Sequence, residues 1–256
     1  PQAFADDLKA QYQVGFEGNL GGENWDAKLR IHAEKDLQVD HDQEVNLEGS
    51  YLAGKLWNQW LIAGQIPTYW GPGHDGGLTR GDASRPVYGV TMQRAEQDAF
   101  DTPWLSWLGS WQYQAFAGQL DDYDVIPKAK LIGLRLTAQP LPYLELGASR
   151  SLQWGGEGRP ESMSSLWDAL LGNKDNGGTG EPDPSNQIAG FDARLNLKQM
   201  VDLSISLYGQ YVGEDEAGLL PAKKMYLAGI DYSSNFNQRP YQVYAEWADT
   251  RTNGEV

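Results

Sequence analysis

Three histidines, His32, His41 and His74, are the side chains of this sequence whose charge changes most readily near neutral pH. None has the spacing that places two histidines on one helical face around zinc, and the chain contains no cysteine. His74 precedes Asp75, a pair that could form half of a hydrolytic dyad, but no Gly-x-Ser-x-Gly sequence supplies a serine nucleophile. The sequence therefore predicts no catalytic residue, no metal and no cofactor.

The charge balance bears on partners and on the remaining kinds of chemistry. The 35 acidic and 20 basic residues give a net charge of −15. Because binding to phosphates needs a basic surface, this balance argues against a nucleic-acid partner. The glycine-rich runs also lack the lysine and the strand-to-helix context of a phosphate loop. Carboxylates are so numerous that a pair acting on glycosidic bonds stays an open alternative.

The elements that must position these side chains are strands, because apolar and polar residues alternate along much of the chain. From Trp25 to Ala33 the odd positions are apolar, and the even positions from 26 to 34 include Asp26, Lys28, Arg30 and Glu34. The same alternation recurs along residues 8–17, 44–51, 191–197 and 201–208. A period of two with one wholly apolar face predicts β-strands.

The predicted strands are long, about 9–12 residues, whereas strands of soluble proteins average about 5–6. This length suits a tilted crossing of a bilayer, and no apolar run reaches the roughly 20 residues of a spanning helix. About eleven or twelve strands are predicted, near 8–18, 24–35, 43–53, 55–67, 87–95, 110–121, 128–138, 143–154, 187–198, 200–213, 222–232 and 240–250. A soluble sandwich with a solvated polar face is the alternative. Strand length, and the Trp or Tyr that often ends an apolar face, favour an all-β, transmembrane antiparallel barrel with a wet lumen.

The predicted connections differ in length. Residues 139–142 and 198–200 are tight turns, whereas residues 155–186 form one long connection. Outer-membrane barrels have short periplasmic turns and long outer loops, so we expect residues 155–186 to lie outside the cell.

One short helix is expected inside this long connection. Met163, Leu166, Trp167, Leu170 and Leu171 repeat at the spacing of one helical face. Ser162 precedes the first of them and Gly172 follows the last, which are typical residues for the start and the end of a helix.

Two segments do not fit a simple series of hairpins. One crossing between Trp70 and Ser110 would place the start of the chain outside the cell, and zero or two crossings would place it in the periplasm. We therefore expect residues 70–110 to fold partly into the lumen. At the other end, residues 249–256 read as an unfinished loop, and a closed barrel must end in a strand that pairs with its first. Residues 1–256 are thus expected to be a single barrel domain, incomplete at the C-terminus.

Glycine-rich and aromatic blocks are densest between residues 60 and 175. They are Trp70–Gly73, Thr102–Gly109, Gly118–Leu120, Pro127–Leu131, Ser151–Pro160 and Leu166–Gly172. In this order, the blocks resemble the Wzi capsule-assembly outer-membrane family. Residues 1–60 and 185–256 agree with that family in strand pattern more than in motif.

The resemblance implies a monomeric outer-membrane barrel of roughly eighteen strands with a helical bundle on the periplasmic side. It also implies a non-enzymatic lectin that holds capsular polysaccharide or exopolysaccharide at the cell surface, in contact with outer-membrane lipid and lipopolysaccharide. This chain departs from the pattern, because residues 1–18 read as strand and only a partial barrel is predicted. A porin-like channel for sugars or small solutes and a barrel hydrolase are the alternatives.

A lectin would bind sugar through aromatic faces and through planar polar groups that match hydroxyl pairs. The candidates for polysaccharide binding are Trp70, His74, Asp75, Arg80, Arg85, Arg94, Trp154, Glu157 and Arg159. Because the chain is acidic overall, a local basic cluster would have to hold an acidic polymer, and the arginines between residues 80 and 94 are the best such cluster.

Each of these candidates also has a structural explanation. The arginines could equally brace a loop against lumen acids such as Glu96 and Asp98. Trp104 and Trp107 sit beside leucines and are interpreted as a buried or girdle cluster rather than as sugar platforms.

Overall fold

The computed structural model describes residues 12–38, 41–81, 87–120, 126–171, 185–214 and 223–251. These residues form 13 strands, all in one antiparallel sheet. The first seven strands are β1 (Tyr12–Gly21), β2 (Trp25–Gln38), β3 (His41–Asn46), β4 (Tyr51–Leu56), β5 (Gln59–Ile66), β6 (Val87–Arg94) and β7 (Ser110–Gln119). The other six are β8 (Lys130–Leu141), β9 (Leu144–Trp154), β10 (Ser185–Asn196), β11 (Ile205–Glu214), β12 (Lys223–Phe236) and β13 (Arg239–Asp249).

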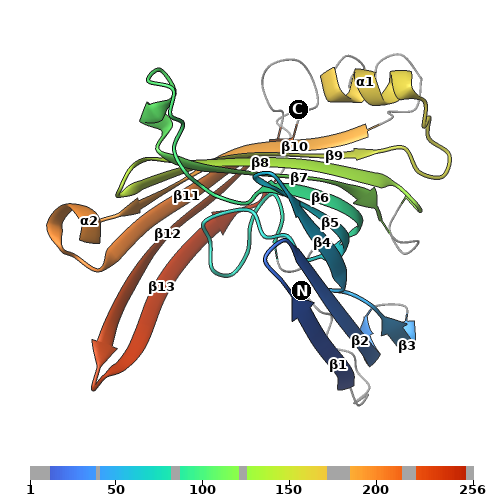
Figure 1. Cartoon of the computed structure of the whole chain (residues 1–256), viewed down its shortest axis with the longest axis horizontal. Helices are drawn as coiled ribbons and strands as arrows, with labels where there is room; N and C mark the ends of the chain where they lie inside the picture. The colour runs from blue at the N-terminus through green and yellow to red at the C-terminus, as the bar shows by residue number, and fades with distance from the viewer. Residues whose placement is uncertain are drawn as a thin grey trace.

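The sheet is a meander in which each strand pairs with the next along the chain. The order is β1-β2-β4-β5-β6-β7-β8-β9-β10-β11-β12-β13, and β3 pairs with β2 beside this path. Figure 1 shows the sheet curved into an arch, with β8, β9 and β10 at its top and β1 and β13 in its two arms. The prediction of an all-β antiparallel sheet is therefore confirmed.

Three predicted strands have wrong boundaries. The strand expected at 55–67 begins only at Gln59, because Lys55 and Leu56 end β4 and residues 57–58 form a turn. Residues 43–53 were expected to be one strand, but they divide into the end of β3 and the start of β4. Between them lies a turn closed by a 2.9 Å hydrogen bond from the Ser50 amide to the Leu47 carbonyl. Gly49 has a φ of 87° in this turn, which glycine adopts at little cost. The strand expected at 200–213 begins only at Ile205, because the short helix α2 (Lys198–Val201) precedes it.

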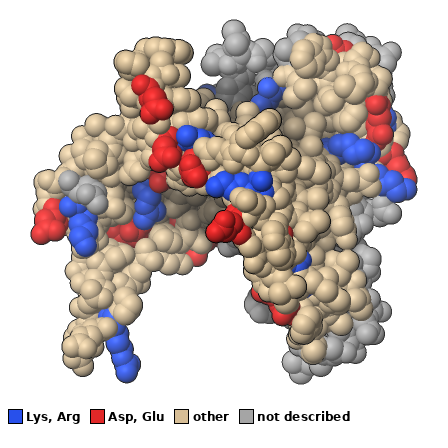
Figure 2. Space-filling model, in the orientation of Figure 1, with Lys and Arg blue, Asp and Glu red and all other residues tan. Residues whose placement is uncertain are grey.

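The concave face of the sheet is polar and its convex, outer face is apolar, which is the reverse of a soluble protein. On β11, Ser206 and Gln210 are buried on the concave face, whereas Leu207 is exposed on the convex face. Phe16 and Phe191 are each 67% exposed. In Figure 2 much of the outer surface is free of charge, and charged atoms gather around the central hollow and near the loops. An apolar outside and a polar inside are the arrangement of a barrel whose outer face meets lipid.

The connections divide the sheet into two ends. The short-turn end holds the turns 22–24, 57–58, 142–143 and 237–238, and the long-loop end holds residues 67–81 and 155–171 of the two long connections. Residues 95–109, with a 3₁₀ turn at Ser106–Leu108, also lie at the short-turn end, because Arg94 at the end of β6 pairs with Gln59 beside the turn 57–58.

The structure shows how many strands lie between Trp70 and Ser110. β6 is one crossing between Trp70 and Ser110, which confirms the strand predicted near 87–95. As a consequence, β1 begins at the long-loop end. The expectation that residues 70–110 fold partly into the lumen is confirmed for residues 70–81, which lie on the concave face, as the contacts below establish.

The helix α1 (Met163–Leu171) lies where the sequence predicts it. The Ser162 hydroxyl accepts a 3.1 Å hydrogen bond from the Ser165 amide, which caps the first turn. Leu166, Leu170 and the buried Ala169 pack against β9. No helix among the described residues is both long enough and apolar enough to cross a membrane.

Candidate functional site

Residues 67–81, which we call the inward loop, leave β5 and lie on the concave face of the arch (Figure 1). Trp70 anchors its first half and is 1% exposed. Its indole lies 5.3 Å from the ring of Phe116 on β7 and donates a 2.7 Å hydrogen bond to the Gln114 side chain. The Trp70 amide donates to the Arg80 carbonyl at 2.9 Å, which closes the loop on itself.

The second half of the inward loop binds to β9 and β11. The Gln210 side chain accepts a 2.9 Å hydrogen bond from the Leu78 amide and donates to the Trp70 carbonyl at 3.2 Å. The hydroxyls of Thr79 and Ser149 are 3.2 Å apart. Buried backbone groups of the loop thus find partners on strands that lie far away in sequence.

Arg80 is buried inside the base of the inward loop. Its Nε donates a 2.7 Å hydrogen bond to the Thr68 hydroxyl, and its guanidinium lies 5.3 Å from the centre of the Phe116 ring. Burial lowers the pKa of the Arg80 guanidinium, because water no longer solvates its charge. This arginine holds the loop together and is not part of the outer surface.

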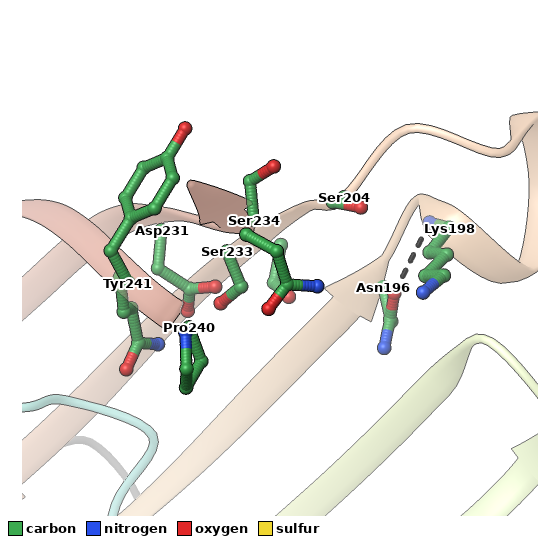
Figure 3. A pocket seen from close by; sticks show the side chains of 11 residues that line it. Asn196, Lys198, Ser204, Asp231, Ser233, Ser234, Pro240 and Tyr241 are labelled. Atoms are coloured by element: carbon green, nitrogen blue, oxygen red, sulfur yellow. Dashed lines mark hydrogen bonds between the residues drawn. The ribbon is translucent and has the colours of Figure 1, made fainter. Parts of the chain in front are cut away.

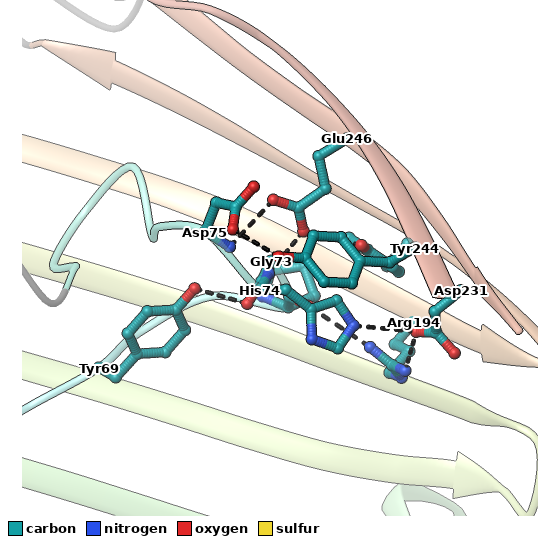
Figure 4. A network of polar contacts seen from close by, with 10 residues as sticks. Tyr69, Gly73, His74, Asp75, Arg194, Asp231, Tyr244 and Glu246 are labelled. Atoms are coloured by element: carbon teal, nitrogen blue, oxygen red, sulfur yellow. Dashed lines mark hydrogen bonds and ion pairs between the residues drawn. The ribbon is translucent and has the colours of Figure 1, made fainter. Parts of the chain in front are cut away.

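The tip of the inward loop is held by one carboxylate, that of Glu246 on β13. Its two oxygens accept hydrogen bonds from the backbone amides of His74 and Asp75 (Figure 4). The Tyr208 hydroxyl donates to the same carboxylate at 2.7 Å. Two adjacent amides and one carboxylate form a charge-assisted contact that fixes the backbone of the tip.

The His74 ring lies between aromatic and charged groups of β11, β12 and β13. It stacks on Tyr244, with the ring centres 4.6 Å apart and the planes at 26°. Its Nε2 is 3.3 Å from Oδ2 of Asp231, which also accepts a hydrogen bond from Arg194. Arg194 donates in addition to the Pro72 carbonyl at 3.4 Å, so the same cation binds loop and strand.

This arrangement does not form the hydrolytic dyad that the sequence left open. The Asp75 carboxylate accepts a 2.7 Å hydrogen bond from the Tyr244 hydroxyl, whereas the His74 ring faces Asp231. Among the contacts of the described residues, no serine or threonine hydroxyl reaches the His74 ring. The described residues contain no group of three or more His, Asp or Glu placed to hold a metal ion. The network fixes the loop across the concave face.

The other predicted site residues of the long-loop end surround the helix α1. Trp154 is buried against Leu152 and Ala169, and its indole donates a 3.1 Å hydrogen bond to the Ser165 hydroxyl. Its ring therefore supports the helix. Glu157 is exposed and accepts a 2.9 Å hydrogen bond from Lys128.

Arg159 lies at the same end and is partly buried. Its amide donates to the Gly156 carbonyl at 3.0 Å. One terminal nitrogen of its guanidinium is buried and has no hydrogen-bond partner within the described part of the chain. Arg159 and Glu157 are thus the two predicted binding residues at the long-loop end that do not belong to a closed internal network.

The arginines between residues 80 and 94 do not come together. Arg94 ends β6 at the short-turn end, about 23 Å of strand away from the residue that begins β6. Its guanidinium donates to the backbone carbonyls of Asp98 and Trp111 and lies 4.2 Å from the centre of the Trp111 ring. Arg85 lies outside the described residues. Trp104 and Trp107 are exposed at the short-turn end, so they do not form a buried cluster, and the girdle interpretation stays a prediction.

Sequence reasoning did not single out the strand residues that hold the loop, namely Arg194, Tyr208, Asp231, Tyr244 and Glu246. A signal for them exists, because each occupies an alternate position of a predicted strand that faces the lumen. Which loop residue each one contacts depends on the path of the inward loop, and the local pattern contains no information about that path.

Comparison with known proteins agrees with this architecture. The family described as capsule assembly protein Wzi matches residues 1–256. An uncharacterized 55.8 kDa protein in the cps region of Klebsiella pneumoniae is 48% identical over 253 residues, which are 99% of this chain and 50% of that protein.

A solved structure of Escherichia coli Wzi is also similar. It is described as an outer-membrane protein involved in group 1 capsule assembly and a carbohydrate-binding β-barrel. The identity is 44% and the TM-score 0.80, and the match covers 94% of this chain and 51% of the other. The chain thus spans about half the length of the relatives it matches. Its sheet has the fold of a β-barrel protein, and the chain belongs to the capsule assembly protein Wzi family.

Proposed function

We propose that this protein is a non-enzymatic lectin of the bacterial outer membrane, a monomer that binds capsular polysaccharide or exopolysaccharide and holds it at the cell surface. The observation that carries the proposal is the combination of an inverted sheet with an inward loop fixed across its concave face. An apolar convex face suits contact with outer-membrane lipid and lipopolysaccharide. A loop fixed across the lumen suits a barrel that holds a polymer better than one that conducts solutes.

The orientation follows from the rule that outer-membrane barrels have short periplasmic turns. On this rule, the short-turn end faces the periplasm, and the long-loop end, with residues 155–171 and their helix α1, faces the medium. Arg159 and Glu157 then lie on the side that meets polymer. Many weak contacts along one chain of sugars give high avidity, so no single deep site is needed.

A conductance measurement separates the lectin from the porin-like alternative. The full-length protein is placed in planar bilayers, with and without added acidic capsular polysaccharide, and polymer binding is measured in parallel. We expect little conductance together with polymer binding. A steady ohmic channel that is indifferent to polymer would overturn the proposal in favour of a porin.

The polymer-binding residues are tested by paired arginine variants at opposite ends of the sheet. Arg159→Ala in the full-length protein should release capsule from cells into the medium, whereas Arg94→Ala should retain it, because Arg94 lies at the short-turn end. Equal retention by the two variants would remove Arg159 from the site, and capsule release by Arg94→Ala alone would contradict the orientation.

A further inference from the structure

A second feature of the concave face is a polar groove at the short-turn end. It has a volume of about 560 Å³ and is lined by β10, α2, β11, β12 and β13 (Figure 3). This volume falls inside the roughly 300–1,000 Å³ typical of small-molecule sites. The groove does not include Arg159, Glu157 or Trp154, so it is separate from the long-loop end.

The strand register explains why the groove is polar. Asn196 on β10 lies opposite Ser206 on β11, and Ser206 lies opposite Asp231 on β12. Two residues further along β12, Ser233 shares the face of Asp231 and lies opposite Gln242 on β13. Two adjacent rows of polar side chains therefore cross β10, β11, β12 and β13. One row contains Asn196, Ser206 and Asp231, and the next contains Ser233 and Gln242. The inward face of a soluble sheet would be apolar at this position.

Asp231 is the charged member of these rows and is buried, as is Ser206. Its side chain is 4% exposed, and the two groups that reach it, His74 and Arg194, both contact Oδ2. Within the described part of the chain, no hydrogen bond reaches Oδ1, although Asp231 lines the groove. Oδ1 is therefore an acceptor at the groove that no described protein group occupies, and a ligand hydroxyl placed there would donate to a charged oxygen, which makes a stronger hydrogen bond than a neutral acceptor does.

The chemistry of the lining selects the kind of ligand. Serine hydroxyls and side-chain amides both donate and accept, which matches the paired donor and acceptor character of sugar hydroxyls. The Asp231 carboxylate accepts from a hydroxyl, whereas a ligand carboxylate or phosphate placed at Oδ1 offers no donor and is repelled. Lys198 also lines the groove, but it lies beside Asn196 and away from Asp231 (Figure 3). We propose that this groove binds a neutral pyranose residue, with Oδ1 of Asp231 accepting from one sugar hydroxyl and the side chains of Ser206, Ser233 and Gln242 bonding to others.

Sugar binding in the groove is a separate proposal, which does not require that the long-loop end holds polymer. Under the orientation proposed above, it opens toward the periplasm, on the opposite side of the inward loop from the surface that holds polymer. Loss of capsule retention in Arg159→Ala tests one site, and small-sugar binding tests the other. Either site can therefore fail in experiment while the other stands.

The test uses the full-length protein in lauryldimethylamine oxide, a detergent without a sugar headgroup that could occupy the groove. The probes are the methyl glycosides of glucose, galactose and mannose, with glucuronic acid as the acidic counterpart. Binding is followed by saturation-transfer nuclear magnetic resonance. We expect at least one neutral glycoside to bind and glucuronic acid to bind at least about fivefold more weakly.

Two variants locate the binding. Ser233→Trp places a large ring in the groove and should abolish the signal, and Ser233→Ala combined with Gln242→Ala should weaken it at least about fivefold through lost hydrogen bonds. Arg159→Ala is the matched control at the long-loop end and should bind as the unaltered protein does. The proposal is overturned if no neutral glycoside binds, if both variants keep full binding, or if glucuronic acid binds equally well in the groove.

Discussion

Arg135 and Asp192 form a bidentate ion pair on the concave face, with guanidinium nitrogens 2.7 and 2.8 Å from the two carboxylate oxygens. Arg135 belongs to β8 and Asp192 to β10, and β9 runs between them. Their side chains are only 12% and 4% exposed. The pair therefore joins two strands that share no backbone hydrogen bonds.

Removal of one member of this pair should destabilise the sheet. Asp192→Ala leaves the Arg135 charge buried without its partner, and we expect the free energy of unfolding to fall by about 3 kcal/mol. The measurement is urea-induced unfolding in phospholipid vesicles. Glu96→Ala is the control, because Glu96 forms an exposed pair with Lys55 at 3.4 Å, and its loss should cost less than about 1 kcal/mol. Equal losses in the two variants would contradict the prediction.

Trp70 should determine whether the inward loop stays in place. Trp70→Ala removes the ring that packs on Phe116 and the indole donor to Gln114, a change that costs about 3–5 kcal/mol in well-packed interiors. We expect faster amide hydrogen exchange across residues 67–81 while exchange in β9 and β10 is unchanged. Trp57→Ala, at a turn residue that is 85% exposed, should leave exchange in the loop unaltered.

The glycines of the inward loop offer a matched pair of substitutions. A Cβ added at Gly73 would lie 2.6 Å from the Gly76 carbonyl oxygen and 3.1 Å from Leu227, whereas one at Gly76 meets nothing within 4 Å. Gly73→Ala should therefore lift the tip off Glu246 and increase protease cleavage between residues 73 and 81. Gly76→Ala should be cleaved as slowly as the unaltered protein, and rapid cleavage of both would contradict the role assigned to Gly73.

The stability of the loop after β9 should depend on pH through the Glu161 carboxyl group. Hydrogen bonds from Lys130 and from the Gly156 amide lower the pKa of the Glu161 carboxyl below its ordinary value of 4.5. Because the folded-state pKa is depressed, the stabilisation is complete above pH 4.5 and is lost as the pH falls through the lower folded value.

The Gly156 amide proton reports this titration in nuclear magnetic resonance spectra. Its chemical shift should change with a midpoint below pH 4.5 and stay flat in Glu161→Gln. A midpoint at or above pH 4.5 in the unaltered protein would contradict the lowered pKa of the Glu161 carboxyl.

The sequence was sufficient to predict most of the strands and the helix α1. In a strand, the face of each side chain follows from position alone, so the alternation from Trp25 to Ala33 determines both the strand and its apolar face. Ser162 and the helical spacing of Met163 to Leu171 determine α1 in the same local way. The break of residues 43–53 was missed because the turn around Gly49 preserves the alternation on both sides.

The candidate site was harder to predict, because its contacts span the chain. Arg80 and Arg94 are near in sequence, yet β6 carries one to each end of the sheet. Conversely, His74 is 172 residues from Glu246 and contacts it directly. Only the curvature of the whole arch brings such residues together, and no local spacing encodes that curvature.

The separation between His74 and Glu246 also has a consequence for the order of assembly. The inward loop follows β5, but the groups that hold its tip belong to β11, β12 and β13, at the far end of the meander. Closing a loop of this length costs entropy that only the finished contact repays, which makes long-range contacts late events in folding. The tip therefore stays undocked until β11, β12 and β13 have joined the sheet, so its docking comes late among the contacts of the described residues.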